Sequence, residues 1–404
     1  MANIKVFTDM IDDVSMGQID TIGNYNVFSN QTIRIMPDVH AGKGCVCGFT
    51  STIGDKIIPN LIGVDIGCGV YVISLGKVDI DFSKLDNIIR TYIPFGTCHR
   101  NSLKDYSNLL GKSLQDLYND WDCDINDCIS LIPDDKSNTI NLSIGTLGSG
   151  NHFIEIDKDA DGNVYLVIHT GSRGLGHTVC KYWQDIAYKH MTSLNKVDIN
   201  YIKQNYPKSD WEYQVKAHRS KCMPINKDLA YVSGDDAKNY LHDLYLAMNW
   251  ADLNRYAIGK IIVDKLGLSD SVIETFTTVH NYIDKDDNIL RKSAIKANKG
   301  QKVLIPLNMS DGSLVCVGKG NPDWNNSAPH GAGRLLSRSQ AKAKLSMDDY
   351  KKSMSGIWTT SICDNTLDES KMAYKPADKI KSQIIDTVDI VKEIKPIYNF
   401  KADN

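Results

Sequence analysis

An aspartate and a cysteine three residues apart are the first side chains whose types and spacing could do chemistry. Asp65 and Cys68 stand in a glycine-rich stretch, 63–69. Glycine lets the backbone turn sharply there, and it leaves a carboxylate and a thiol unobstructed as ligands for a metal ion. The apolar run 61–64 predicts the end of a buried strand. The alternative is a cysteine buried in a tight turn, with Asp65 capping the next element.

Two further histidines follow segments that could deliver them to a site. His169 comes directly after the apolar run 164–168, which predicts a buried strand, and a loop of glycine, serine and arginine follows it. This arrangement is typical of a ligand beside an anion-binding loop, whereas a hydrogen-bonded core histidine is the alternative. His280 follows a run rich in threonine and valine.

A central glycine-rich block, 145–150, precedes Asn151, His152 and Glu155. Its glycine order does not match a dinucleotide-binding motif, so a flexible loop that brings Asn151 and His152 into a site is the better interpretation. Strict alternation along a strand would place His152 and Glu155 on opposite faces. Both can therefore reach one cleft only if the backbone is irregular just after the glycines.

Two other loops combine histidine, glycine and basic residues. The stretch 33–44 predicts a strand that opens into a loop with Asp38 and His40, which suits contacts with phosphate or metal. A charged surface turn is the alternative for this loop. The stretch 329–338 places one histidine and two arginines around glycines at a predicted helix start. Such an arrangement is suited to holding phosphates.

Hydrophobic periodicity predicts the elements that position these loops. Helical patterns cover three ranges: 81–140, 237–260 and 377–395. Strand patterns, two of them joined as a hairpin across Asp311 and Gly312, cover four: 70–75, 164–168, 303–305 and 314–317. The acidic stretch 157–162 predicts a hairpin turn, because Ile168 stands where a calcium loop needs glutamate. His242 and Asp243 are expected on a solvated helix face.

Composition narrows the function classes. The net charge of −3 over 404 residues excludes a strongly basic protein, so any contact with nucleic acid depends on a local basic surface. We expect a soluble, cytoplasmic protein without membrane contact, because no apolar run approaches the length of a membrane span and the N-terminus turns acidic early. The ten cysteines include no CxxC pair, which indicates reduced thiols and argues against a structural zinc ribbon.

Taken together, the motifs resemble the RtcB family of RNA-splicing ligases. The matching blocks follow the family order and cover nearly the whole chain: 36–44, 63–69, 145–155, 169–174, 280–282, 329–338 and 373–375. The resemblance implies a sheet arrangement and one domain over residues 1–404. We therefore expect an α+β fold in which stacked mixed β-sheets surround a polar metal-binding cleft and helices lie outside.

The resemblance also implies a reaction. An RNA end with a 3′-phosphate or 2′,3′-cyclic phosphate would be joined to a 5′-hydroxyl end, in tRNA splicing or RNA repair, using GTP and two Mn²⁺ ions. His330 would be the nucleophile that takes GMP. The implied metal ligands, with the Cys68 thiolate as bridge, are Asp65, Cys68, His152, His169 and His280. The expected nucleotide contacts are Asn151, Glu155, Asn308, Gly331, Ala332, Gly333 and Lys401. The candidates for RNA and phosphate binding are Arg173, Lys292, Arg334 and Arg338.

The chemistry of the donor side chains supports this reaction independently of the resemblance. A mixed set of carboxylate, imidazole and thiolate suits manganese or zinc better than magnesium, and paired divalent ions can orient phosphates. A neutral imidazole is a competent nucleophile toward phosphorus. The chain contains no KxDG sequence, which argues against a ligase with a lysine nucleophile.

The sequence departs from the family at several positions. Leu307 and Asn308 stand where a glycine and a serine are usual, and Ser293 replaces a glycine. The chain also continues past Lys401 to Asn404, where the family usually stops at Lys-Gly. These differences bear on nucleotide choice and on the role of Lys401 more than on metal binding.

Two other functions are compatible with parts of the sequence. The stretches 38–40, 54–55 and 150–152 mimic motifs of a dinuclear metal phosphoesterase, but Ile58, Phe153 and Val179 stand where that class needs polar partners. A nonenzymatic RNA-binding repair factor is the second alternative. The retention of His330 and of every candidate ligand argues against it. The sequence identifies no activating protein partner.

Overall fold

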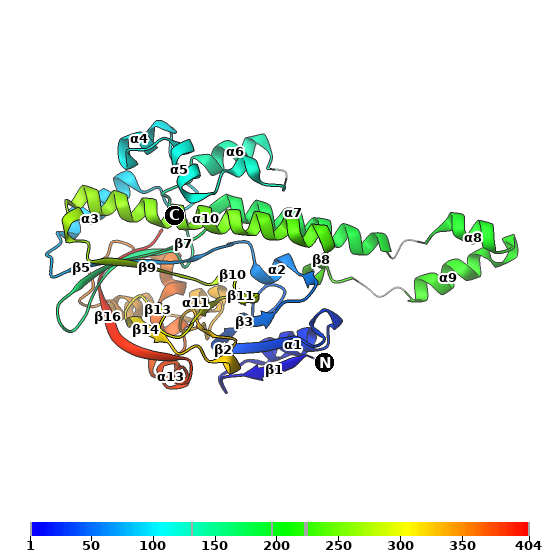
Figure 1. The fold of residues 1–404 in the computed structure, drawn as a ribbon. Helices are drawn as coiled ribbons and strands as arrows, with labels where there is room; N and C mark the ends of the chain where they lie inside the picture. The colour runs from blue at the N-terminus through cyan, green and yellow to red at the C-terminus, as the bar shows by residue number, and fades with distance from the viewer. Residues whose placement is uncertain (1, 131, 195–196, 222–224, 403–404) are drawn as a thin grey trace.

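The fold consists of two large β-sheets covered by helices (Figure 1). The computed structural model describes residues 2–130, 132–194, 197–221 and 225–402. The arrangement confirms the predicted α+β class with several sheets.

The larger sheet has the strand order β13-β14-β16-β6-β7-β5-β9 and is antiparallel throughout. Its strands are β5 (Gly69–Gly76), β6 (Phe153–Lys158), β7 (Val164–Thr170), β9 (Glu274–Val279), β13 (Lys302–Asn308), β14 (Gly312–Gly318) and β16 (Val388–Phe400). The backbone N–H of Leu304 on β13 donates to Thr278 Oγ1 on β9 at 3.0 Å. The two ends of the sheet therefore approach each other, and the sheet curls.

The second sheet has the order β1-β2-β3-β11-β10 and is mixed, because only β1 and β2 pair in parallel. Its strands are β1 (Asn3–Val6), β2 (Thr32–His40), β3 (Cys47–Thr52), β10 (Asn281–Ile283) and β11 (Ile289–Lys292). Two short ladders connect the remaining strands, which are β4 (Lys56–Ile57) with β8 (Val232–Ser233), and β12 (Ala294–Lys296) with β15 (Ser327–Pro329).

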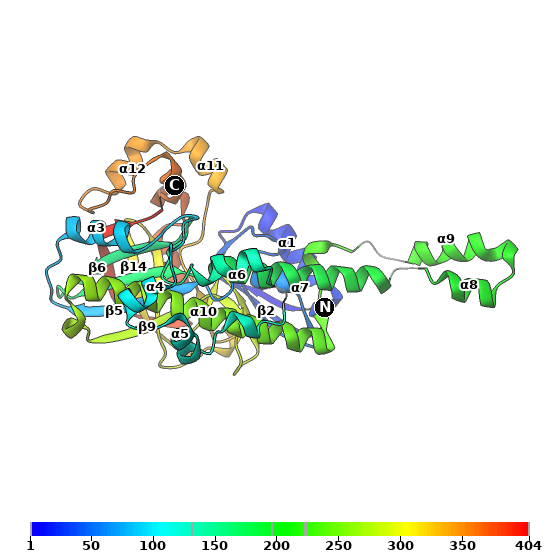
Figure 2. The ribbon, with the colours of Figure 1, turned by 90° about the horizontal axis from the view of Figure 1, so that it is seen from above.

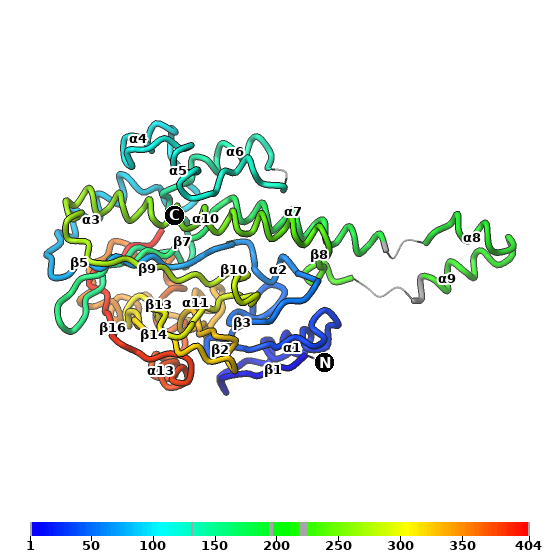
Figure 3. The backbone as a smooth tube through the Cα atoms, viewed as in Figure 1, coloured from blue at the N-terminus to red at the C-terminus, as the bar shows by residue number. Residues whose placement is uncertain are grey.

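Helices cover the outside of the sheets. They are α1 (Asp13–Gly23), α2 (Pro59–Ile62), α3 (Phe82–Tyr92), α4 (Lys104–Leu110), α5 (Leu114–Trp121), α6 (Asp134–Asn141), α7 (Arg173–Leu194), α8 (Ile199–Asn205), α9 (Trp211–Lys221), α10 (Gly234–Leu266), α11 (Arg338–Lys344), α12 (Met347–Ser353) and α13 (Ala377–Gln383). The long helices α7 and α10 run side by side across the larger sheet (Figure 3). The short helices α8 and α9 project away from the body, whereas α11 and α12 lie near the C-terminus (Figure 2).

The buried side of α10 positions the loops of the site. Asn254 Oδ1 accepts from the N–H of Thr146 at 3.0 Å, and its amide nitrogen donates to the carbonyl of Gly171 at 3.0 Å. Arg255 donates to the carbonyls of Gly67 and Thr170 at 2.7 and 2.8 Å. Asn254 and Arg255 are both buried, and they tie three separate loops together.

Two predicted elements are wrong. The run 61–64, predicted as a strand end, belongs to the short helix α2, because Pro59 favours a first helical turn and Gly63, at φ 88°, ends it. The predicted helix over 377–395 stops at Gln383, and β16 begins at Val388. Strand pairing on both sides, with β14 and β6, outweighs the helical periodicity of this segment.

Three local predictions also need correction. The stretch 329–338 contains no helix start at its histidine, since β15 ends at Pro329 and α11 begins only at Arg338. Strand β2 continues to His40, so Asp38 lies in a strand rather than a loop. Asp243 is fully buried instead of solvated, because it accepts from the N–H groups of residues 129 and 130 and from Trp183.

Candidate metal and nucleotide site

A turn, two strand ends and a glycine loop bring five ligand-capable side chains together. Asp65 and Cys68 lie in the turn between α2 and β5, and Cys68 Sγ is 3.5 Å from His152 Nε2 and 3.4 Å from His169 Nε2. Asp65 Oδ2 is 3.0 Å from His152 Nε2, and His169 Nε2 is 3.4 Å from His280 Nε2. All five predicted ligands are therefore adjacent.

Strand β6 begins at Phe153, so His152 precedes the strand. The backbone is thus irregular where the sequence required it, because Gly148 and Gly150 have φ of 86° and 75°. Glu155 can consequently follow strand alternation while His152 reaches the metal ligands from the loop. The glycine at 148 is also needed for space, because a Cβ there would lie 2.7 Å from His152 Nδ1.

Backbone carbonyls orient two of the imidazoles. His152 Nδ1 donates to the carbonyl of Leu147 at 2.9 Å, and His169 Nδ1 donates to that of Asn151 at 3.2 Å. Both Nε2 atoms therefore lack a proton when the rings are neutral, and both point toward Cys68. Carbonyl partners of this kind fix the tautomer and orientation of metal-binding histidines.

The electrostatics favour neutral imidazoles. Burial, followed by the neighbouring His152, holds the pKa of His169 well below its usual range. Burial and the neighbouring His330 do the same for the pKa of His280. Burial and the charge of Asp65 raise the pKa of the Cys68 thiol, so a divalent cation would have to displace its proton.

The donor set fits a pair of metal ions. The ligand atoms form two groups that share Cys68, one with His169 and His280 and the other with Asp65 and His152, and within each group the atoms lie within 4.8 Å of one another. Among the described residues, Cys68 is the member common to both groups. Thiolate, imidazole and carboxylate together suit Mn²⁺ or Zn²⁺.

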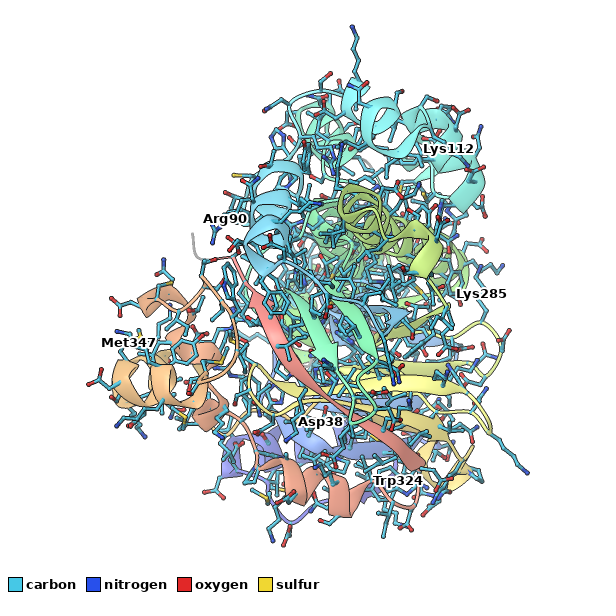
Figure 4. All side chains as sticks on the ribbon, turned by 90° about the vertical axis from the view of Figure 1, so that its left-hand side faces the viewer. Asp38, Arg90, Lys112, Lys285, Trp324 and Met347 are labelled. Atoms are coloured by element: carbon cyan, nitrogen blue, oxygen red, sulfur yellow. The ribbon has the colours of Figure 1, made fainter. Side chains whose placement is uncertain are left out.

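His330 lies beside this cluster and is held in one orientation. Its ring centroid is 4.8 Å from that of His280. Its Nδ1 donates to Asp38 Oδ2 at 2.6 Å, and its backbone N–H donates to the same oxygen at 3.2 Å. Asp38 is fully buried on β2, inside the molecule as labelled in Figure 4, where Met347 marks α12 at the outer edge. With Nδ1 as donor, Nε2 of a neutral ring carries the free lone pair.

His330 opens into a cavity of about 730 Å³, within the size range of small-molecule sites. Every residue predicted to contact the nucleotide lines this cavity: Asn151, Glu155, Asn308, Gly331, Ala332, Gly333 and Lys401. His169 also contributes to the wall, so the cavity reaches the metal cluster. Residues 306–309, at the end of β13, line it as well, which places the sequence departures at Leu307 and Asn308 on the cavity wall.

Buried charges mark the inner end of the cavity. Glu155 accepts from the side-chain amide of Asn399, and Lys401 Nζ lies 3.2 Å from Glu369 Oε2. Burial raises the pKa of Glu155 to about 7, although Lys401 opposes this shift. Asp157, two residues further along β6, is fully buried without a hydrogen-bond partner, and burial raises its pKa well above the usual range.

The predicted anion-binding residues divide into two pairs. Arg334 and Arg338 line the cavity and lie near Asp368 and Glu369. Arg173 instead donates to the carbonyl of Gly96 at 2.7 Å, and the buried Lys292 donates to the carbonyl of Cys45 at 2.9 Å. The structure therefore turns the second pair toward backbone carbonyls, away from the cavity wall.

Sequence reasoning missed two carboxylates that organise the site. Asp38 was visible only as part of a loop motif, without its contact to His330. Glu369 carried no signal, yet it contacts Lys401, Arg334 and Tyr374. The contacts of Asp38 with His330 and of Glu369 with Lys401 and Arg334 join residues far apart in the chain, so they depend on the tertiary fold, which no local pattern reveals.

The fold and site define a class of protein in which a buried cluster of mixed donor side chains, suited to metal ions, adjoins an oriented histidine at the wall of a cavity of nucleotide size. A family model described as "tRNA-splicing ligase RtcB" matches residues 18–402. The chain therefore belongs to the RtcB family.

Named relatives agree with this assignment. The chain is 28% identical over 395 residues to the RNA-splicing ligase RtcB of Escherichia coli strain K12, with 92% of this chain and 90% of the relative covered. It is 27% identical to the tRNA-splicing ligase RtcB of Aeropyrum pernix, with coverage of 90% and 86%. The corresponding protein of Nanoarchaeum equitans is also 27% identical, with coverage of 86% and 82%.

Proposed function

We propose that this protein is a GTP- and Mn²⁺-dependent RNA ligase. It joins RNA ends that carry a 3′-phosphate or 2′,3′-cyclic phosphate to 5′-hydroxyl ends through a histidine–GMP intermediate. The observation that carries the proposal is the position of His330, which Asp38 orients beside His280 at the wall of the cavity. Membership in the RtcB family supports the reaction class.

The metal ligands would be Asp65, Cys68, His152, His169 and His280, with Cys68 shared between two Mn²⁺ ions. These ions would supply Lewis acidity that offsets negative charge on phosphate oxygens. The chain itself would present the imidazoles of His152 and His169 to the ions in a fixed orientation, because backbone carbonyls already hold both rings.

His330 supplies the nucleophile in this mechanism. Its Nε2 lone pair attacks the α-phosphorus of GTP, a P–N bond forms, and the bond to pyrophosphate breaks. The ring then carries positive charge, which the Asp38 carboxylate stabilises through the bond to Nδ1. An oxygen of the RNA 3′-phosphate then attacks the phosphorus of GMP, the P–N bond breaks, and its electron pair returns to Nε2 of His330. The 3′-phosphate now carries GMP as a good leaving group. The 5′-hydroxyl displaces GMP and closes the phosphodiester bond.

The inner end of the cavity is proposed to hold the guanine base. A carboxylate such as Glu155 accepts hydrogen bonds from two adjacent N–H groups, which matches the edge of guanine. Lys401 would donate to the base, and Asn151 would contact phosphate. Arg334 and Arg338 at the cavity wall are proposed to bind the triphosphate and the RNA phosphates, because guanidinium pairs well with phosphate oxygens.

Arg173 and Lys292 stay predictions for RNA binding, although the structure gives them a supporting role in the loops. Among the residues that the structure describes, none of the helices combines the length and apolar character that a bilayer crossing requires. We propose a cytoplasmic enzyme that acts in tRNA splicing or RNA repair.

Ligation of defined RNA strands tests this function. A strand with a 3′-phosphate and a strand with a 5′-hydroxyl should be joined in the presence of GTP and Mn²⁺, whereas a 3′-hydroxyl and 5′-phosphate pair should not. Omission of GTP or addition of a chelator should abolish joining. Release of phosphate without joining would favour the metal phosphoesterase. RNA binding that needs neither GTP nor metal would favour the nonenzymatic repair factor.

A further inference from the structure

The cavity wall contains a thiol that the ligation mechanism does not use. Cys47, the first residue of β3, is half-buried and lines the cavity together with His40 and His330. None of the described cysteines forms a disulfide. A nucleophilic side chain on the wall of a nucleotide-sized cavity can react with compounds small enough to enter.

An imidazole faces this thiol across the sheet. His40 is the register partner of Cys47 in the β2–β3 pair. Its Nδ1 donates to the carbonyl of Asp38 at 2.9 Å, which leaves Nε2 for the thiol side. Burial opposes a charged ring, yet the neighbouring Cys47 and the Asp38 carbonyl together raise the pKa of His40 to about 9.

The surroundings stabilise a thiolate at Cys47. Burial opposes the charge, but His40 and Lys292 together lower the pKa of Cys47 to about 6. The other charged and titratable groups around the His40–Cys47 pair are Lys292, Asp38 and Cys45. Cys45 differs sharply, because full burial raises the pKa of its thiol to about 11. The thiol pKa values of two cysteines only two residues apart are thus shifted in opposite directions.

The glycine at position 42 leaves room for the sulfur. A Cβ built there would lie 3.3 Å from Cys47 Sγ and 2.6 Å from the carbonyl oxygen of Cys45. The sulfur therefore packs directly against the backbone of the loop that follows β2. On its other side the cavity offers about 730 Å³, enough for a tripeptide-sized group.

We propose that Cys47 is a thiol modification site whose occupancy blocks the nucleotide cavity. The compound that modifies Cys47 is a low-molecular-weight disulfide. The inference rests on the proposed use of this cavity for GTP. The Cys47 thiolate attacks one sulfur of the disulfide, and a new S–S bond forms. The original S–S bond breaks, and the departing thiolate keeps the electron pair and takes a proton from solvent. A reducing thiol reverses the reaction.

Alkylation by iodoacetamide, mapped by mass spectrometry at several pH values, tests the thiolate. Cys98 is exposed and serves as the comparison within the same chain. At pH 6 a thiol of pKa about 6 is about 160-fold more ionised than one of pKa about 8.5, whereas its intrinsic nucleophilicity is about 10- to 20-fold lower. Cys47 should therefore react about tenfold faster at pH 6 than a thiol of ordinary pKa, with Cys98 as the reference within the same chain. The Cys47 rate should have its midpoint near pH 6, and His40→Gln should raise this midpoint.

Treatment with oxidised glutathione tests the consequence for the cavity. Wild type should lose His330 labelling by GTP and regain it after reduction. Cys47→Ser should still be labelled by GTP at His330 in the presence of oxidised glutathione. Cys98→Ser should lose and regain labelling as wild type does. Bound GTP should also protect Cys47 from iodoacetamide, a readout that needs no catalysis.

Three outcomes would overturn the inference. The first is an alkylation rate of Cys47 whose pH midpoint lies at an ordinary thiol pKa. The second is an equal loss of GTP labelling by Cys47→Ser and wild type after treatment with oxidised glutathione. The third is full GTP labelling of protein that is modified at Cys47. A failure of the proposed function would look different, because wild type would then never label, even when reduced, while the alkylation midpoint stayed near 6.

Discussion

The contact between Asp38 and His330 gives the sharpest quantitative test of the site. Asp38 Oδ2 accepts from both Nδ1 and the backbone N–H of His330. Asp38→Ala removes both bonds and the charge that stabilises the ring after it has attacked phosphorus. Asp38→Asn keeps an oxygen acceptor but removes the charge. The two variants therefore separate ring orientation from charge stabilisation.

The geometry sets the expected magnitude. A hydrogen bond to a charged group contributes about 1.5–3 kcal/mol, and about 1.4 kcal/mol corresponds to a tenfold change in rate. Asp38→Ala should slow transfer of GMP to His330 about 10- to 150-fold. In Asp38→Asn a neutral hydrogen bond to His330 retains about 1 kcal/mol of this stabilisation. Asp38→Asn should therefore slow the transfer of GMP to His330 only about tenfold.

The assay is single-turnover labelling of the protein by GTP carrying label in its α-phosphate, with thermal unfolding measured in parallel. Asp86→Asn is the matched control, because Asp86 is also buried and accepts from Tyr398 at 3.0 Å, but it does not line the cavity. It should label at the wild-type rate. Labelling of folded Asp38→Ala at the wild-type rate would refute the role of Asp38.

Three further predictions follow from the same geometry. Elemental analysis should show that Cys68→Ala loses both bound Mn²⁺ ions and that His280→Ala loses only one. The reason is that, of these two residues, only Cys68 belongs to both ligand groups. Equal losses would contradict a bridging role. Gly333→Ala should destabilise the fold by more than about 1 kcal/mol in chemical unfolding, since φ is 74° and its Cβ would lie 2.2 Å from the Asp38 carbonyl oxygen. Gly300→Ala, at φ 80° in open space, should cost less, and equal costs would exclude the clash. Burial raises the pKa of Glu155 to about 7, so the folded state binds this proton more tightly than the unfolded state does. The proton therefore adds to the free energy of unfolding. This contribution is full below about pH 4.5 and is lost as the pH rises through about 7. Glu155→Gln should flatten that part of the unfolding profile, and an unchanged slope would contradict the shift.

The local elements of this fold were predictable wherever one pattern dominated. The runs that became β7 and the β13–β14 hairpin have both the apolar character and the turn residues of strands. The helix predicted over 377–395 was wrong beyond Gln383, because apolar residues at helical spacing also fit a strand that is bent by bulges. Pairing with β14 and β6 decides its structure, and such pairing depends on residues at least 70 positions away.

The ligand types of the site could be predicted from the sequence, but its organisation could not. Cysteine, histidine and aspartate next to glycine mark candidate ligands because few structural roles need them there. The partners that orient them leave no such mark. The carbonyl of Leu147 and the carboxylate of Glu369 act through position alone, and Asp38 needs the approach of β2 to His330.

Labelling of the purified protein by α-phosphate-labelled GTP and Mn²⁺ tests the central claim most directly. Wild type and His330→Ala are incubated, denatured and separated from free nucleotide. The account predicts a label on wild type only, labile in acid and stable in base, as expected for a phosphorus–nitrogen bond to histidine. Equal labelling of His330→Ala, or no label on metal-replete wild type, would contradict it.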